Sequence, residues 1–300
     1  MKRNKILVFL LSLLVVLGLV FGVAGCKKKT EEASTKNEVE SSAKTDVEEK
    51  NTKKIKVIVT TSLIENIVKE IGGDNFDVTV MIPPGGCPGH FDIKPEDIKA
   101  VASGSLFLKH GWETWAENLI KSANNPNLKV ETIAIKGNWM VPTFQIEAVD
   151  KIAAVLSGVD KENSDSYHEK AASYKKKVGK VAADAKKRCE DNKLSEISVI
   201  CAQMQEGFVK WLGFNVVATY GRPDELTPEI IKDLVDKCND NNVKLVIDNL
   251  QSGANVGLQV AQDVGANHII LSNFPGAIEG ANDYEGNLNH NLGEVLSNVQ

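Results

Sequence analysis

Two stretches of the chain carry side chains that bind soft metal ions. Cys87 precedes His90 by three residues, and Cys201 precedes Met204 by three residues. Thiolate, thioether and imidazole groups favour thiophilic ions such as copper(I) or zinc. A fold that brings the two stretches together would therefore build a metal site, to which His110 could add a second imidazole.

Other residues favour a different ligand. Trp112 and Trp139 offer flat apolar walls for a small organic molecule. Arg222, in a Tyr-Gly-Arg-Pro stretch, could clamp a carboxylate or phosphate group. The sequence thus leaves open whether a bare metal ion or a small organic or metal-chelate ligand is bound.

An enzyme is the hypothesis from another class. A cysteine nucleophile needs a histidine within hydrogen-bond reach, which Cys87 with His90 or His110 could supply. The sequence holds no Gly-x-Ser-x-Gly or His-Glu-x-x-His motif. We therefore predict that the protein is not an enzyme; the alternatives are a thiol-dependent enzyme and an adhesin.

The elements that must position these residues alternate between strand and helix. Strands are expected at residues 56–60, 76–82, 105–108 and 128–133, and again at 197–201, 214–218, 244–248 and 268–272. Helices are expected at residues 62–71, 95–103, 113–122, 206–211, 228–239 and 254–264. This repeat predicts two α/β lobes with parallel sheets, residues 54–160 and 195–300.

A long helix is expected to join the lobes. Residues 161–194 are rich in Ala and Lys and lack Pro, and a helix over them would span about 45 Å. In parallel sheets, ligands bind beyond the carboxyl ends of the strands. The candidate residues follow predicted strands, which places the ligand cleft between the two lobes.

The N-terminus predicts export. Two cations precede an apolar run that ends in Ala-Gly before Cys26, so residues 1–25 are expected to form a signal peptide. The ending resembles a bacterial lipobox, in which the cysteine is lipidated; one spanning helix is the alternative. Residues 26–53 comprise this cysteine and a polar, disordered tether. We expect lipid anchoring on the extracytoplasmic face of a bacterial membrane, at the cell surface or in the periplasm.

Composition limits the partners. The net charge of −5 and the pI near 5.7 leave no basic surface for nucleic acid. The chain has five cysteines, of which Cys26 is assigned to lipid, and the sequence does not decide whether the others pair. Cys189 and Cys238 lie on predicted helices and are assigned to the core, where free cysteine is common.

From Lys54 onward the chain resembles the zinc and manganese group (cluster A-I) of solute-binding proteins of ABC transporters. The motifs that carry the resemblance are Thr-Thr-Ser after the first strand, GHFDIKPED at 89–97, GWETW at 111–115, GFVKWLGF at 207–214 and the Asp-Tyr-x-x-x-Leu run at 283–288. The resemblance implies two Rossmann-like lobes joined by a rigid helix. It also implies a monomeric, lipid-anchored receptor that delivers a transition metal ion (zinc, manganese or copper) to an ABC permease in the membrane.

The resemblance also implies four metal-ligand positions, of which this sequence keeps one. His90 matches the first. Asn138 and Gln203 stand where the family has histidines, and Asn273 stands where it has an aspartate. Neutral amides are poor ligands for zinc, which prefers Cys, His, Asp or Glu. The expected site is therefore atypical, and its ligand is either a metal in a changed ligand set or a small organic or chelated molecule.

Overall fold

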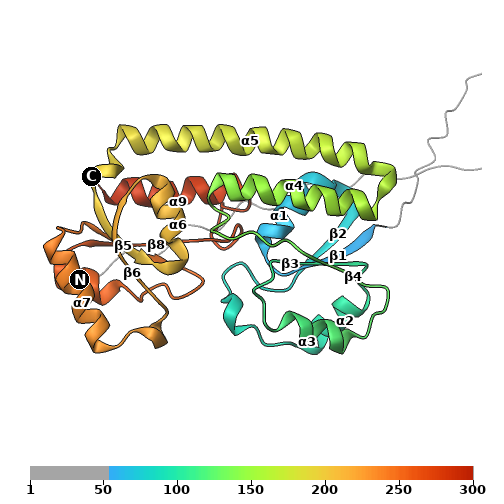
Figure 1. Ribbon diagram of the computed structural model, residues 1–300, viewed down its shortest axis with the longest axis horizontal. Coiled ribbons are helices and arrows are strands. Elements are labelled where there is room, and N and C mark those ends of the chain that lie inside the picture. The colour runs from blue at the N-terminus through green and yellow to red at the C-terminus, as the bar shows by residue number, and fades with distance from the viewer. Residues whose placement is uncertain (1–53, 300) are drawn as a thin grey trace, which may run out of the picture. The chain divides into compact units, whose positions relative to one another are not determined.

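The computed structural model describes residues 54–299, which contain two parallel β-sheets covered by helices (Figure 1). The predicted signal peptide, the lipidation site Cys26 and the tether lie outside the described residues. Within residues 54–299, no helix is both long and apolar enough to cross a bilayer. The two-lobe α/β architecture predicted from the sequence is confirmed.

The first sheet has the strand order β2-β1-β3-β4. Its strands are β1 (Ile55–Val59), β2 (Phe76–Val80), β3 (Leu106–Lys109) and β4 (Lys129–Thr132). Its helices are α1 (Ser62–Gly72), α2 (Pro95–Ala102) and α3 (Ala116–Ala123). All strand pairs are parallel, so the loops that follow β1, β2 and β3 emerge at one edge of the sheet.

The second sheet repeats this pattern in the order β6-β5-β7-β8. Its strands are β5 (Ser198–Ala202), β6 (Asn215–Tyr220), β7 (Leu245–Asn249) and β8 (Asn267–Leu271). Its helices are α6 (Glu206–Leu212), α7 (Pro228–Asp240) and α8 (Leu258–Val264). These strands are also parallel, which gives the second lobe its own edge of carboxyl ends.

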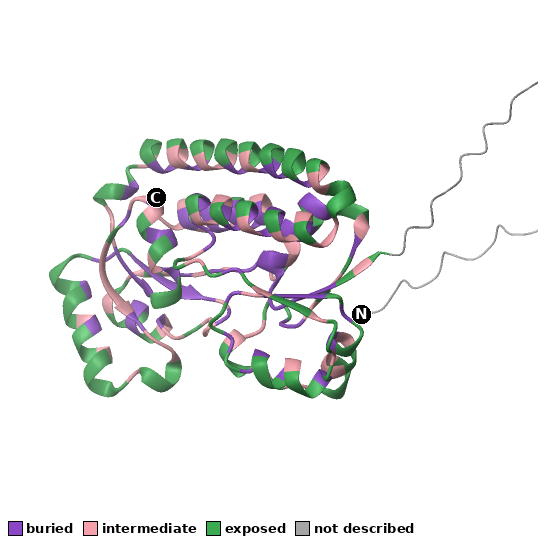
Figure 2. Ribbon diagram, turned by 45° about the vertical axis from the view of Figure 1, so that its right-hand side comes forward, coloured by how far each residue is buried: buried purple, intermediate pink, exposed green. Residues whose placement is uncertain are grey.

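One long helix, α5 (Ser164–Asp191), runs over both lobes, as the sequence predicted (Figure 1). A 3-10 turn precedes it at Lys161–Asn163 and another follows it at Leu194–Glu196. Its outward side is exposed and its inward side is buried (Figure 2). The buried residues recur every three or four positions at its N-terminal half, which is the period of a helix that packs one face.

The sequence analysis did not assign two helices beneath α5. These are α4 (Pro142–Val159), which completes the first lobe, and α9 (Tyr284–Asn298), which ends the chain. Both contact α5, and α4 also packs on α1. The N-terminus of α9 is capped by Asp283, whose side chain accepts a hydrogen bond from the backbone of Gly286 at 2.7 Å.

A single hydrophobic cluster extends beneath α5 from one sheet to the other. The strand residues in it are Val57, Val59, Phe76, Leu106, Leu108, Val199, Cys201, Leu245, Ile247, Ile269 and Leu271. The residues between them face two outer clusters, one in each lobe. Both faces of the central strands β1, β3, β5 and β7 are therefore buried, which explains why these strands are mostly apolar, whereas the edge strands β2 and β4 are partly exposed.

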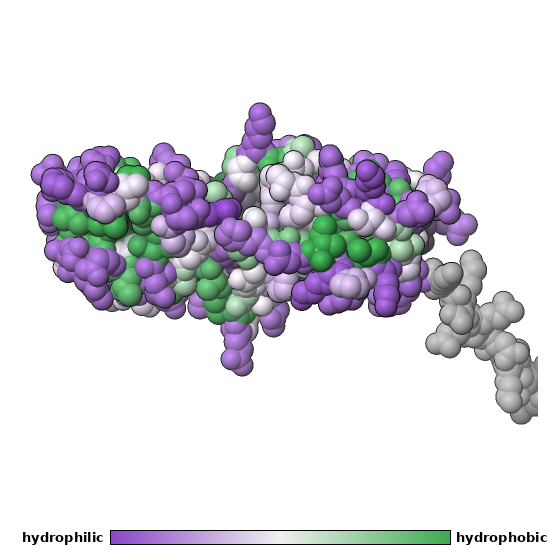
Figure 3. Space-filling view, turned by 90° about the horizontal axis from the view of Figure 1, so that it is seen from below, coloured by the Kyte–Doolittle hydropathy of each residue, from purple (hydrophilic) through white to green (hydrophobic). Residues whose placement is uncertain are grey.

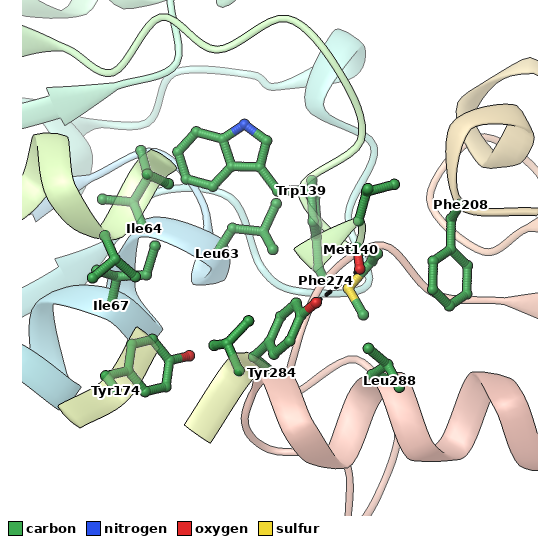
Figure 4. Close-up of a cluster of buried hydrophobic side chains, with 14 of the residues drawn as sticks. Leu63, Ile64, Ile67, Trp139, Met140, Tyr174, Phe208, Phe274, Tyr284 and Leu288 are labelled. Carbon is green, nitrogen blue, oxygen red and sulfur yellow. Dashed lines mark hydrogen bonds between the residues drawn. The ribbon is translucent and has the colours of Figure 1, made fainter. Parts of the chain in front are cut away.

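Side chains from distant parts of the chain meet in this cluster (Figure 4). The Tyr284 hydroxyl donates a hydrogen bond to the backbone oxygen of Met140 at 2.9 Å. The side-chain amide of Asn287 contacts the Met140 sulfur at 3.2 Å and donates to the backbone oxygen of Ser272 at 3.0 Å. These bonds hold the start of α9 against the loop before α4 and thereby join the two lobes.

A packing test follows from the close approach of α1 and β2. A methyl group on Gly72 would lie 2.3 Å from Cδ2 of the buried Phe76, although the backbone of Gly72 is ordinary for any residue. We expect Gly72→Ala to lower the free energy of unfolding by about 1–3 kcal/mol through overpacking. Urea denaturation measures this change.

The matched control is Gly179→Ala, in the middle of α5, where the added methyl group meets nothing within 4 Å. This change should raise stability by about 0.5–1 kcal/mol, because alanine favours the helix. Equal effects of the two changes would contradict the packing described here.

Candidate functional site

Three loops meet through amide groups at the junction of the two lobes. Asn138, in the loop before α4, donates from Nδ2 to Oδ1 of Asn273, which follows β8, at 2.8 Å. Both side chains also donate to the backbone oxygen of Met204 in the turn after β5, at 2.8 Å and 3.0 Å. We call Asn138, Asn273 and the Met204 carbonyl the amide cluster.

The amide cluster contains two of the four positions that the family resemblance singled out. Asn138 is further fixed because its Oδ1 accepts the backbone N–H of Met140 at 2.8 Å. Gln203, the third position, adjoins Met204 in the turn and has an exposed side chain. A neutral hydrogen bond stabilises by only about 0.5–1.5 kcal/mol, so a ligand can displace these bonds.

His90 lies in the 3-10 turn Pro88–His90, and its side chain is exposed. The turn is held by Trp115, whose Nε1–H donates to the backbone oxygen of Pro88 at 3.2 Å. Arg222 of the second lobe reaches this turn, where its guanidinium packs against Gly89. The imidazole of His90 is therefore free for a ligand on a turn that both lobes contact.

Sequence reasoning missed one side chain that joins the lobes. Gln251, in the loop after β7, donates from Nε2 to the backbone oxygen of Pro84 at 2.9 Å and to Oγ of Ser272 at 2.9 Å. Its Oε1 accepts the backbone N–H of Asn273 at 3.1 Å. Residue 251 belongs to the strand-end segments where ligands are expected, but no motif distinguishes it.

A second polar group lies in the first lobe, behind Trp112. His110 is buried, and its Nε2 lies 2.8 Å from Oγ1 of Thr61. Its ring stacks on Trp112 with centroids 5.1 Å apart and meets Trp139 edge-on at 4.4 Å. Burial lowers the pKa of His110 to about 4, against the opposing charge of Glu113, so the imidazole is neutral at pH 7.

Glu113 fixes the loop that carries His110 and Trp112. Its carboxylate accepts hydrogen bonds from the backbone N–H groups of His110 at 2.8 Å and Gly111 at 2.7 Å, and from Oγ1 of Thr60 at 2.6 Å. A carboxylate with three donors is well satisfied despite burial. Trp112, in the loop that Glu113 fixes, is 48% exposed, whereas Trp139, the other predicted wall, is buried in the core.

The structure does not assemble the soft-metal set of Cys87, His90, Cys201 and Met204. The Cys201 side chain lies in the hydrophobic cluster beneath α5, where burial raises the pKa of its thiol to about 12. Cys87 is partly exposed, and the described cysteines are all free. Residues 54–299 contain no group of three or more His, Cys, Asp or Glu side chains arranged to hold a metal. Cys189 and Cys238 are buried in the core, as predicted.

The face of the protein opposite α5 is mainly hydrophilic, with separate hydrophobic patches (Figure 3). Two α/β lobes with parallel sheets, one helix that spans them and a polar junction between them are the architecture of a two-lobe solute-binding protein. The sequence comparison gives the family. The profile described as zinc-uptake complex component A, periplasmic, matches residues 57–297, and the chain belongs to this family. This membership confirms the predicted receptor and excludes an enzyme.

Similar proteins agree with this assignment. The manganese ABC transporter substrate-binding lipoprotein PsaA of Streptococcus pneumoniae is 26% identical over 261 residues, 77% of this chain and 78% of that protein. The metal ABC transporter substrate-binding lipoprotein FimA of Streptococcus parasanguinis is 27% identical over 220 residues, 63% of this chain and 70% of that protein.

Solved structures share the fold. A crystal structure of ZnuA superposes with a TM-score of 0.71 at 19% identity, over 83% of this chain and all of that chain. The cadmium-bound periplasmic metal binding protein of candidatus liberibacter asiaticus gives a TM-score of 0.71 at 18% identity, over 82% of this chain and all of that one.

The neutral His110 predicts a specific pH dependence of stability. The unfolded chain binds this proton near the ordinary pKa of 6.5, but the folded protein binds it only near pH 4. The stability that the neutral His110 contributes is therefore complete above pH 6.5 and is lost as the pH falls towards 4. The free energy of unfolding falls by up to about 3 kcal/mol from this group over that range. In His110→Gln, we expect the free energy of unfolding, measured with urea, to change less between pH 6.5 and pH 4 than it does in the wild type.

The control is His168→Gln, because His168 is exposed on α5. This variant should keep the wild-type dependence on pH. If His110→Gln also kept the wild-type dependence on pH, the assignment of a buried, neutral imidazole to His110 would be wrong.

Proposed function

We propose that the protein is the extracytoplasmic receptor of an ABC metal importer, and that it binds a metal-containing ligand at the lobe junction through His90 and the amide cluster. The observation that carries this proposal is the direct contact of Asn138 with Asn273 across the lobes. In a receptor of this family, the second and fourth ligand positions must approach each other when the lobes close on a ligand. Family membership and the metal-binding relatives support the same role.

We further propose that a lipid on Cys26 tethers the receptor as a monomer beside its permease. The supporting observation is the lipobox-like ending of the apolar N-terminal run. PsaA and FimA, both described as lipoproteins, are consistent with it. A tethered receptor stays close to the membrane while it turns to meet the permease.

The ligand set implies weak binding of a bare ion. One imidazole and three neutral amides provide one strong donor for zinc, where a structural or transport site uses several. The exchange of two histidines for amides removes two imidazole donors, and the exchange of the aspartate for Asn273 removes the negative charge that attracts a cation. Zinc or manganese should therefore bind more weakly than in a site with the full set of imidazoles and carboxylates.

An organic ligand is the second candidate, favoured by Trp112. This residue is 48% exposed, and its indole stacks on the buried His110 ring with centroids 5.1 Å apart. A flat, exposed aromatic side chain is typical of sites for organic molecules.

Metal analysis of the full-length protein, purified reduced and without chelator, tests the proposal. We expect substoichiometric zinc or manganese that disappears in His90→Ala, because this variant removes the strong donor. His168→Ala is the control, since it removes an exposed imidazole from α5. An unchanged metal content in His90→Ala would place the site elsewhere. A discrete organic mass bound to the protein in native mass spectrometry would favour the second candidate.

A gain of function is a sharper test. We expect Asn138→His with Asn273→Asp to strengthen zinc binding by at least about tenfold, because the pair restores an imidazole and a carboxylate to contacting positions. Competition with a fluorescent zinc chelator measures the affinity.

The matched control is Asn239→His with Asn241→Asp, at two exposed positions at the end of α7, which should add no zinc binding. If the junction pair also left the affinity unchanged, the proposed ligand positions would be wrong.

A further inference from the structure

An arginine from the second lobe reaches the turn that carries His90. Nη1 and Nη2 of Arg222 each lie 2.8 Å from the point where a Cβ on residue 89 would stand. Only glycine at position 89 lets the guanidinium approach the backbone so closely. Since Gly89 precedes His90 directly, the charge of Arg222 lies beside the one strong metal ligand of the junction.

This guanidinium has no partner within residues 54–299. Its five N–H donors make no hydrogen bond there, and no carboxylate pairs with it. Asp92, Asp224 and Glu225 are the nearest acidic residues in sequence to His90 or Arg222, and all three are exposed. Arg222 itself is only partly exposed. A partly desolvated guanidinium without a partner is a ready site for a carboxylate or another anion.

The rest of the junction does not offset this charge. Asn138, Asn273, Gln203 and Gln251 are neutral. The carboxylate of Glu225 lies against the backbone of Gly221, but it makes no ion pair with the Arg222 guanidinium. A bare divalent cation at His90 would be repelled by Arg222. A ligand with its own negative charge would instead be attracted, and the amides could hydrogen-bond it as donors and acceptors.

We propose that the cargo is a metal ion held in a carboxylate-bearing chelate of net negative charge. His90 fills a free position on the metal, Arg222 binds a carboxylate of the chelator, and the amide cluster opens to hydrogen-bond its oxygens. One imidazole is sufficient because the chelator supplies the other donors. This inference rests on the proposed function and names the chemical class of its substrate.

Isothermal titration of the full-length protein in detergent tests the inference with four probes. These are zinc chloride, zinc nitrilotriacetate, which is net negative with open positions on the metal, zinc tris(2-aminoethyl)amine, which is net positive with an open position, and nitrilotriacetate alone. We expect the negative chelate to bind at least about tenfold more tightly than the other three.

Variants assign the binding to the proposed residues. Arg222→Gln should weaken binding of zinc nitrilotriacetate by about tenfold or more and leave zinc chloride unchanged or bound more tightly. His90→Ala should abolish chelate binding. Arg188→Gln, which changes the other arginine of residues 54–299 on α5, is the control and should behave as the wild type.

Other outcomes separate this inference from the proposed function. Tighter binding of zinc chloride than of the chelate would overturn the inference and keep the metal receptor. Equal binding of nitrilotriacetate with and without zinc would overturn both, since the receptor would then recognise an organic anion. The inference would also be overturned if neither zinc chloride nor zinc nitrilotriacetate bound. The same holds if the two zinc chelates bound equally well to the wild type and to Arg222→Gln.

Discussion

The hydrophobic cluster beneath α5 is the constraint on which the junction depends. It is continuous from β1 and β3 through α4, α5 and α9 to β5 and β7. Packed cores resist gradual deformation, so the two sheets keep a defined relation to each other. The polar loops at the carboxyl ends of the two sheets are therefore held against each other through the same residues. An uninterrupted helix across both lobes also resists a wide hinge, which favours small movements of loops over large movements of lobes.

That rigidity decides what neutral amides can do at the junction. Asn138 and Asn273 satisfy each other and the Met204 carbonyl when no ligand is between them. A histidine and an aspartate, which the family resemblance implies at these positions, would place a negative charge here that a bound cation offsets. Amides need no cation, because they are both donors and acceptors. The replacement of charged ligands thus changes the contact between the lobes as well as the affinity for metal.

Sequence reasoning was most accurate where the chemistry is local. Strand and helix positions followed from apolar runs and periodicity, and the loop of His90 followed from its motif. Cys201 shows the limit: both faces of a buried parallel strand are apolar, so the sequence cannot tell which face its side chain joins. Gln251 shows another, since its bond to Pro84 joins residues 167 positions apart and leaves no local pattern. The helices α4 and α9 were missed although their buried residues recur every three or four positions, so a local helical period was present in both segments.

Gln251 also connects the amide cluster to the loop of His90. Its oxygen accepts the backbone N–H of Asn273, and its nitrogen donates to the backbone oxygen of Pro84. Gln251 thus bonds the backbone of Asn273 to the loop that presents His90 and meets Arg222. The bond to Pro84 fixes that loop against the second lobe, so the hydrophobic cluster beneath α5 does not position it alone. Groups far apart in the sequence are held together at the junction by a single amide side chain.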